Sequence, residues 1–367
     1  MPHRKIRFAL LLFLFLVVCH AAEQDTFEGV ERVVAIGDIH GDFNRLVELL
    51  RTAKLIDTGN AWSGGAAHLV MCGDMVDRGP ASRQVLDLLM DLEPQAKKAG
   101  GEVHVLLGNH ETMDIYGDLR YVSASDYQSY SSENSAKLRD NAFKQALDDL
   151  RSHGSPPPDV EKFRQTFEEQ HPLGWVEFRL AFGSTGKYGK WLRQKNAVIR
   201  VNDLLFLHGG ISPKYAKWTR AKINSRIREE LEDFDKIPHG MVQDPEGPLW
   251  YRGLDQGPQS DDAMSTHIGH VLEVQQAKHI VVGHTVFPTI VPRFGARVIT
   301  IDVGLSAVYG GPPAFLLEEG GKIYVMYRGT RVDFPASGVN PEAYFREEAA
   351  LDPPGSPILR SLGALLR

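Results

Sequence analysis

The sequence predicts a layered α/β core, because short apolar segments alternate with amphipathic helical patterns. Five apolar segments read as buried strands; they span residues 33–36, 68–72, 103–107, 204–207 and 280–282. Residues 43–50 and 85–90 place apolar side chains at helical spacing between the first three segments. A strand, helix, strand succession of this kind favours a layered α/β fold.

Polar side chains with metal-binding chemistry follow each predicted strand. They are Asp38, His40, Asp74, Asn109, His208 and His284. Open α/β folds place their sites at the carboxyl ends of strands, so we expect these side chains to meet in one crevice. Mixed oxygen and nitrogen ligands without a thiolate favour manganese, iron or zinc over magnesium alone.

Two ions in such a crevice suit phosphoryl transfer. Ions roughly 3.5–4 Å apart can stabilise both the attacking and the leaving oxygen. Asp38 and His40 lie two residues apart and can grip one ion, while Asp74 is free to bridge both. We expect a water held between the ions as a bridging hydroxide to attack phosphorus directly, without a covalent phosphoenzyme.

Further residues beside the predicted ligands suit phosphate binding and proton transfer. The planar guanidinium groups of Arg78 and Arg252 fit phosphate oxygens, with an ordinary structural ion pair as the alternative for each. His110 follows the ligand Asn109 and could protonate the leaving oxygen, oriented by Asp77. Among the predicted ligands, Asp38 or Asp74 taken singly could instead be a helix cap or turn residue, and His40, His208 or His284 a satisfied core histidine.

The remaining histidines are expected to be structural. His267 and His270 are one helical turn apart but follow no predicted strand, which weakens a ligand role. His68, His104 and His171 are likewise interpreted as structural residues. Cys72 lies in an apolar segment and is interpreted as a small buried side chain.

Residues 1–22 are predicted to be a secretory signal peptide. A basic start precedes an apolar run over residues 8–18, and small residues follow at Ala21 and Ala22. The run is shorter than the roughly 20 residues that span a bilayer, although an uncleaved anchor is the alternative. We therefore expect an exported protein, periplasmic or secreted (in the secretory pathway if eukaryotic), with no stable membrane span after cleavage.

The rest of the chain is predicted to form one catalytic domain over residues 30–332, which suits the length of 367 residues. A polar, helical insertion is expected at about 123–195 and a hairpin over 314–327. Residues 333–367 are expected to be a Pro-rich, loop-like tail with a short amphipathic helix at 358–366. A net charge of −6 without a basic stripe argues against nucleic acid as a partner.

Five sequence blocks are specific when taken together and in order. They are Gly37-Asp38-Ile39-His40-Gly41, Gly73-Asp74-Met75-Val76-Asp77-Arg78-Gly79, Gly108-Asn109-His110-Glu111, His208-Gly209-Gly210 and Gly283-His284-Thr285. These blocks resemble the signatures of the phosphoprotein phosphatase branch of the calcineurin-like metallophosphoesterases. The resemblance implies a central β-sandwich of two mixed sheets flanked by helices. From its position in the chain, we expect the helical insertion to lie over the core, near the mouth of the site.

The resemblance also implies residue roles. One metal ion would be held by Asp38, His40 and Asp74, and the other by Asp74, Asn109, His208 and His284. Arg78 and Arg252, with Asn109, would bind phosphate, and His110 with Asp77 would form the acid pair.

A finer resemblance, to the Shewanella-like protein phosphatases, rests on the segments at 108–114, 117–122, 186–192 and 248–253. It implies a protein phosphatase acting on a phosphorylated protein or peptide, or on a small phosphoester, with phosphotyrosine favoured. Leu107 stands where eukaryotic Ser/Thr enzymes usually carry Arg, and the loop containing Tyr309 only loosely matches their tyrosine-bearing loop. The alternatives are a dinucleoside polyphosphate hydrolase and an inactive binding protein on the same scaffold.

Overall fold

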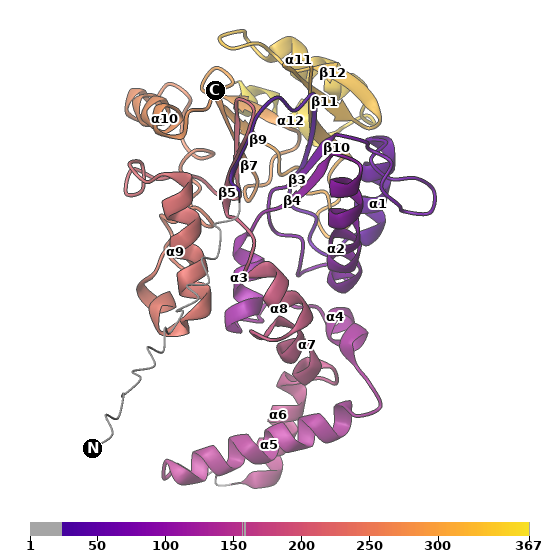
Figure 1. The fold of residues 1–367 in the computed structure, drawn as a ribbon, viewed down its shortest axis with the longest axis vertical. Coiled ribbons are helices and arrows are strands. Elements are labelled where there is room, and N and C mark those ends of the chain that lie inside the picture. Colours follow the sequence, from indigo (N-terminus) through magenta and orange to yellow (C-terminus); the bar gives the residue numbers. More distant parts are fainter. Residues whose placement is uncertain (1–23, 156, 158, 367) are drawn as a thin grey trace, which may run out of the picture.

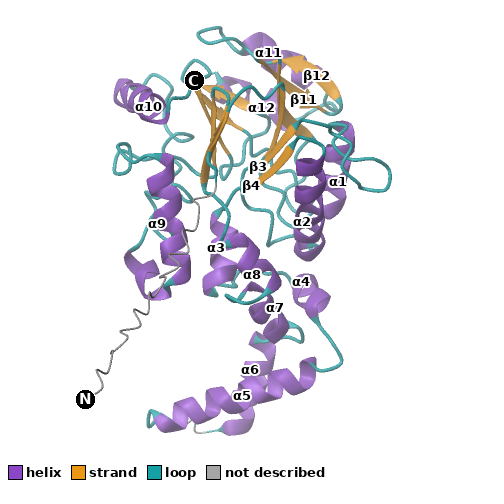
Figure 2. Ribbon diagram, in the orientation of Figure 1, coloured by secondary structure: helices purple, strands orange, loops and turns teal. Residues whose placement is uncertain are grey.

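The computed structural model describes residues 24–155, 157 and 159–366 of the chain. The predicted signal peptide over residues 1–22 lies outside the described residues. Two six-stranded sheets form the centre, and helices surround them (Figures 1 and 2). Buried side chains from both sheets and from the adjoining helices belong to one continuous hydrophobic core.

The first sheet has the strand order β12-β11-β10-β2-β3-β4. Its strands are β12 (Thr330–Asp333), β11 (Lys322–Tyr327), β10 (Ala314–Glu319), β2 (Arg32–Ile36), β3 (His68–Met71) and β4 (Glu102–Val105). β2, β3 and β4 are parallel, so their carboxyl ends lie at one edge. β10 and β11 form the predicted hairpin, in which Glu319 pairs with Lys322 across Gly320 and Gly321.

The second sheet has the strand order β1-β5-β6-β7-β9-β8. Its strands are β1 (Thr26–Phe27), β5 (Val198–Val201), β6 (Leu204–Leu207), β7 (His279–Val282), β9 (Val298–Thr300) and β8 (Val291–Arg293). β6, β7 and β9 are parallel, whereas β5 runs antiparallel to β6 and β8 runs antiparallel to β9; β1 pairs with β5 in parallel. The prediction of two mixed sheets flanked by helices is therefore confirmed.

Helices α1 (Phe43–Thr52) and α2 (Ser82–Lys98) connect the parallel strands β2, β3 and β4. The Asp42 side chain caps α1 by accepting a hydrogen bond of 3.0 Å from the backbone N–H of Arg45. α1 buries Leu46, Leu49 and Leu50, which are the apolar positions that predicted this helix. α3 (Asn109–Tyr116) begins close after β4, so that Asn109 stands at the edge where the parallel strands end.

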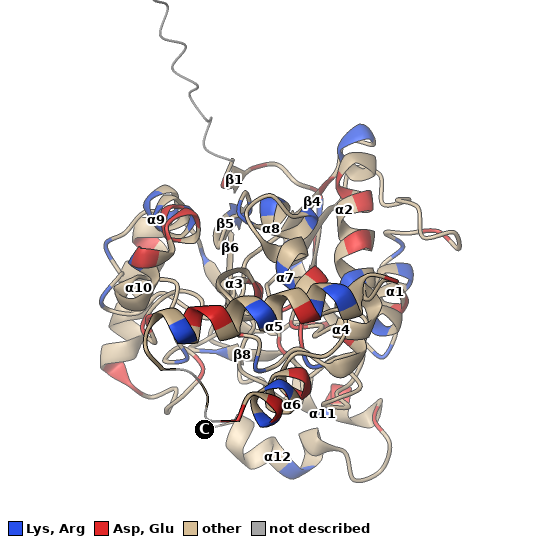
Figure 3. Ribbon diagram, turned by 90° about the horizontal axis from the view of Figure 1, so that it is seen from below, with Lys and Arg blue, Asp and Glu red and all other residues tan. Residues whose placement is uncertain are grey.

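Five helices occupy the segment between α3 and β5. They are α4 (Ala124–Tyr130), α5 (Ser135–Ser152), α6 (Val160–Gln170), α7 (Trp175–Phe182) and α8 (Lys187–Leu192). α5 and α6 project away from the sheets and pack on each other through Phe143, Leu147 and Phe167 (Figure 1). Acidic and basic residues are interspersed along both helices (Figure 3), and Arg164 Nη1 pairs with Asp140 Oδ1 at 2.9 Å.

The remaining helices are α9 (Arg220–Glu232), the 3₁₀ helix η1 (Phe234–His239), α10 (Asp262–Gln275), α11 (Glu342–Ala350) and α12 (Pro357–Leu365). The short helix expected at 358–366 is confirmed as α12. The expectation of loop beyond Asp333 is wrong for α11, because Tyr344 and Phe345 lie on a helical face that is buried against the core. Pro341 marks the beginning of α11 rather than a continuous loop. Within the described residues, none of the helices has the length and hydropathy needed to cross a membrane.

Candidate metal centre

The carboxyl ends of parallel strands from both sheets meet at a cavity of about 180 Å³. Asp38 and His40 follow β2 and Asp74 follows β3, whereas His208 and His284 follow β6 and β7 of the other sheet. The cavity is lined by five of the six predicted ligands, which are Asp38, His40, Asp74, Asn109 and His284. His208 lies behind them and is fully buried. The structure therefore brings all six side chains together.

Nε2 of His208 is the centre of a cluster of oxygen and nitrogen atoms. It lies 3.2 Å from Oδ2 of Asp74, 3.0 Å from Oδ1 of Asn109 and 3.0 Å from Nδ1 of His284. On the other side of Asp74, the same Oδ2 atom lies 3.8 Å from Nε2 of His40. The Asp74 carboxylate thus stands between two imidazole rings, as a group shared by two ions would.

Backbone carbonyls determine which nitrogen of each ring faces the cluster. Nδ1 of His208 donates to the Cys72 carbonyl at 2.9 Å, and Nδ1 of His40 donates to the Val76 carbonyl at 3.0 Å. Nε2 of His284 donates to the Trp250 carbonyl at 3.1 Å. Since a carbonyl only accepts, the opposite nitrogen of each ring faces the cluster, where it can present a lone pair when the ring is neutral. These tautomers are the ones that metal binding requires.

The charges in the cluster also favour a cation. Burial raises the pKa of Asp38 well above its usual value, and the neighbouring Asp302 adds to this effect. Although burial alone would lower the pKa of His208, Asp74 and Asp38 raise it to about 10. Burial lowers the pKa of His40 to about 4 and, together with His208, that of His284 to about 2. Asp74 and Asp38 thus favour positive charge at the position of His208, whereas the rings of His40 and His284 stay neutral, and the mixed donor set fits divalent metal ions.

A buried carboxylate holds the loop that carries Asp74. Glu111 accepts hydrogen bonds from the backbone N–H groups of Asp74 at 2.9 Å, Met75 at 2.7 Å and Gly108 at 2.8 Å. A Cβ atom at Gly73 would lie 2.7 Å from the Gly108 backbone, so this close approach requires glycine.

Several non-glycine residues of the centre adopt the left-handed backbone region. The φ angles are 43° at His40, 52° at Asp74 and 67° at His284. Such conformations cost free energy and are over-represented at functional sites, where the surrounding structure maintains them.

Two arginines lie at the cavity. The Arg78 guanidinium lies 4.6 Å from the ring centroid of Tyr121, and its Nη2 atom is 3.5 Å from Nε2 of His110. Arg252 donates to the carbonyl of His284 and, at 3.0 Å, to Oγ1 of Thr285. Both guanidinium groups line the cavity and can present N–H donors to an anion.

His110 and Asp77 are in direct contact. Nδ1 of His110 lies 2.6 Å from Oδ2 of Asp77, and both side chains are buried. The backbone N–H of His110 donates to Oδ1 of Asp74 at 3.1 Å, which ties this pair to the candidate metal centre.

Residues 31–288 match the model of the calcineurin-like phosphoesterase family. The chain belongs to this family. It is 34% identical over 77% of its length to an uncharacterized protein of Schizosaccharomyces pombe, covering 76% of that protein. It is 27% identical over 77% of its length to Shewanella-like protein phosphatase 2 of Arabidopsis thaliana, covering 73% of that protein.

Among solved structures, the phosphoesterase chain resembles the cold-active protein-tyrosine phosphatase of a psychrophilic Shewanella species. The TM-score is 0.64 at 29% identity, with 85% of this chain and 82% of that chain covered. The resemblance to the Shewanella-like protein phosphatases that the sequence blocks indicated is thereby confirmed, as is the assignment of a hydrolase.

The phosphoesterase cavity includes residues that the sequence did not single out. Asp302, Tyr121 and Trp250 line it beside the predicted ligands. Asp302 follows the segment Val298 to Ile301, which contains β9, so the strand-end signal that revealed the predicted ligands also applied here. Tyr309, a doubtful contact from sequence, lies at the cavity with its ring centroid 5.7 Å from that of His40.

The histidines at 267 and 270 lie elsewhere. Nε2 of His267 is hydrogen-bonded to the Ile211 carbonyl at 2.7 Å, and His270 is exposed on α10. Neither residue lines the candidate metal centre of the phosphoesterase.

Proposed function

We propose that this phosphoesterase is a two-metal phosphomonoester hydrolase that removes phosphate from proteins or peptides. Asp38, His40 and Asp74 would hold one ion, and Asp74, Asn109, His208 and His284 the other. The observation that supports this assignment is the position of Oδ2 of Asp74, 3.8 Å from Nε2 of His40 and 3.2 Å from Nε2 of His208. Manganese or iron, with zinc as a further option, suits the mixed oxygen and nitrogen donors.

Divalent ions in this position would neutralise phosphate charge and activate water for direct attack on phosphorus. Arg78 and Arg252, which are far apart in the sequence, both line the cavity. Their N–H groups would hold the phosphate in position. The Asn109 amide lies beside them and can contact the same phosphate. His110, held by Asp77, would give a proton to the departing oxygen.

The rim of the cavity supports an aromatic phosphoester as the favoured substrate. The rings of Tyr121, Trp250 and Tyr309 line the cavity, and Tyr121 and Tyr309 are 36% and 40% exposed. Flat rings at the mouth can pack against a phosphotyrosine ring in an offset or edge-on arrangement. The Shewanella relative of known structure is described as a protein-tyrosine phosphatase, which agrees with this preference.

A substrate panel tests the proposal. Protein loaded with Mn²⁺ is assayed on a phosphotyrosine peptide, the same peptide with phosphoserine, and diadenosine tetraphosphate. We expect the highest kcat/KM for the phosphotyrosine peptide and a large loss for Asp74→Asn. A clear preference for the dinucleotide would make the chain a dinucleoside polyphosphate hydrolase. No hydrolysis of any substrate with Mn²⁺, Fe²⁺ or Zn²⁺ would instead support a binding protein on this scaffold.

A further inference from the structure

A second group of metal-binding side chains lies at the opposite end of the parallel strands. His68 is the first residue of β3, whereas Asp74 follows the end of that strand. His68 pairs in register with Glu102 of β4, and His104 lies two residues beyond Glu102. Because side chains alternate along a strand, all three project from the same face of the sheet.

The two imidazole rings are in direct contact, and the Glu102 carboxylate lies near them. Nε2 of His104 lies 2.9 Å from Nδ1 of His68. One ligand atom from each of His68, Glu102 and His104 lies within 4.8 Å of the others. His68 and His104 are 8% and 7% exposed, so the rings are held by packing rather than free at the surface. The ring of Phe27 from the other sheet packs on His104 at a centroid distance of 4.4 Å.

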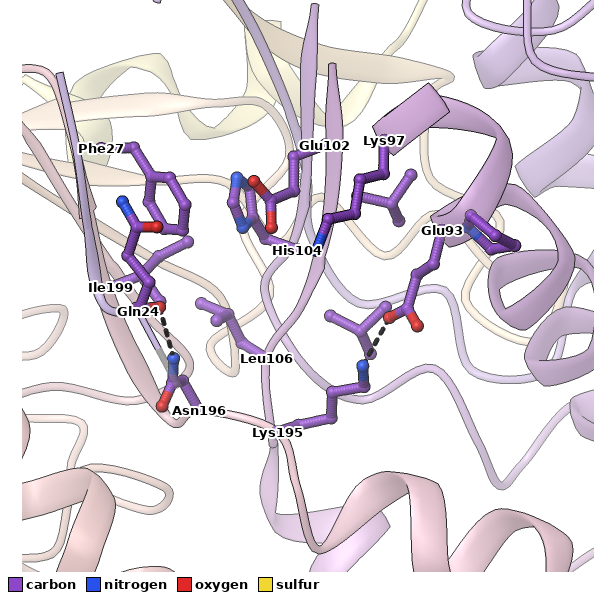
Figure 4. Close-up of a pocket in the computed structure, with 13 residues that line it drawn as sticks. Gln24, Phe27, Glu93, Lys97, Glu102, His104, Leu106, Lys195, Asn196 and Ile199 are labelled. Atoms are coloured by element: carbon purple, nitrogen blue, oxygen red, sulfur yellow. Dashed lines mark hydrogen bonds and ion pairs between the residues drawn. The ribbon is translucent and has the colours of Figure 1, made fainter. Parts of the chain in front are cut away.

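A cavity of about 420 Å³ gives access to this group. It lies between β4 of one sheet and the β1–β5 edge of the other (Figure 4). Glu102, His104 and Lys97 gather in the same part of the cavity in Figure 4. Lys195 is turned away to Glu93, with Nζ 2.6 Å from Oε1.

We propose that His68, Glu102 and His104 form a third metal site, which binds one Zn²⁺ ion. Two imidazoles and one glutamate are a zinc donor set that leaves a coordination position open, here toward the cavity. This proposal does not depend on the proposed phosphatase function.

A hydrogen bond between two neutral imidazoles is the simpler explanation of the contact, but it gives Glu102 no direct partner. The Glu102 side chain is half-buried; the charges of Lys97 and Lys195 act on it from a distance, but no hydrogen bond or close ion pair joins it to a described residue. Burial lowers the pKa of His68 and, with His68 itself, lowers that of His104 to about 3, so both rings are neutral and can present lone pairs. A divalent cation is the partner that uses all three groups at once.

Zinc content measured by mass spectrometry tests the site. The full-length protein is equilibrated with Zn²⁺, desalted and compared with Glu102→Ala and His68→Asn. We expect each variant to bind one zinc ion fewer per chain than the wild type. Glu133→Ala and His279→Asn, which change the same residue types elsewhere, should match the wild type.

The difference between variant and wild type does not depend on how many ions the catalytic centre holds, so the two proposals can fail separately. Circular dichroism in the presence of EDTA verifies that each variant is folded. Equal zinc content in folded Glu102→Ala and wild type would overturn the third site. An anomalous-difference map at the zinc edge is a second measurement, because it should show a peak among the three side chains; a map without that peak would also refute the site.

Discussion

Nδ1 of His110 lies 2.6 Å from Oδ2 of Asp77, while Nε2 of the same ring lies 3.8 Å from Oδ2 of Asp74. Burial alone would lower the pKa of His110, but the two carboxylates raise it above its usual value. The ring can therefore keep a proton beside the cavity. This arrangement suits a general acid better than it suits a further metal ligand.

Replacing His110 should separate these two roles. We expect His110→Asn to lower kcat on a phosphotyrosine peptide by about 10²–10⁴-fold, the usual contribution of general acid–base catalysis. Its metal content should equal that of the wild type, measured by mass spectrometry on the same preparation. His270→Asn, an exposed histidine on α10, is the control and should keep full turnover. Unchanged kcat in His110→Asn would exclude the acid role, and a lost ion would make His110 a ligand instead.

The predicted ligands could be found from the sequence because each one lies within a few residues after an apolar strand segment. Asp38 follows β2 and His284 follows β7, and the rule needs only local pattern and the tendency of parallel strands to end together. Asp302 obeys the same rule, because it follows Ile301 just after the end of β9.

Other features depend on contacts between distant parts of the chain. β10 pairs with β2 through Leu316 and Ala35, a separation that no local periodicity encodes. Glu111 could be recognised as part of a sequence block, yet its bonds to the Asp74 loop follow only from the folded turn. The helix α11 was missed because prolines dominate its flanks, whereas burial of Phe345 determines its structure.

Asp74 should be required for both ions. We expect Asp74→Asn to reduce the metal content at the catalytic centre by more than one ion per chain, because its carboxylate lies between His40 and His208. Turnover should fall by at least about 100-fold, since even changes around metal ligands cost 10–100-fold. Metal analysis after Mn²⁺ loading measures the first effect, and Asp91→Asn on the exposed face of α2 is the control. Full occupancy and activity in Asp74→Asn would refute the bridging role.

Glu111 should stabilise both the fold and the centre. In Glu111→Gln, an NH₂ group replaces one of the two oxygens that accept hydrogen bonds from backbone N–H groups. This NH₂ group would then face a backbone N–H, so two buried donors would have no acceptor between them. We expect the free energy of unfolding to fall by about 2–3 kcal/mol, the cost of leaving buried polar groups unsatisfied. Metal affinity should fall about 10–100-fold, as for other groups that orient ligands. Urea unfolding and metal titration measure the two effects, with exposed Glu133→Gln as the control; wild-type values for both would show that Glu111 does not support the Asp74 loop.

Glu348 should make the stability depend on pH. It is fully buried on α11, where Oε2 accepts a hydrogen bond of 2.5 Å from Oγ1 of Thr289. Burial raises its pKa from an ordinary value of 4.5 to about 8. Between these two values the folded chain keeps a proton that the unfolded chain has released, so stability falls as pH rises from about 4.5 to about 8.

The variant Glu348→Gln cannot ionise and should lose this dependence. We expect the variant to have the same free energy of unfolding as the wild type near pH 5 and to be more stable by about 2–4 kcal/mol at pH 8.5. This range takes 1.36 kcal/mol per unit of pKa shift and allows for relaxation of the folded state around the charge. Urea unfolding in EDTA at the two pH values measures the difference. Glu347→Gln, exposed on the same helix, should keep the wild-type slope. If Glu348→Gln and the wild type lose stability equally between pH 5 and pH 8.5, then Glu348 is ionised in the folded protein and α11 tolerates its charge.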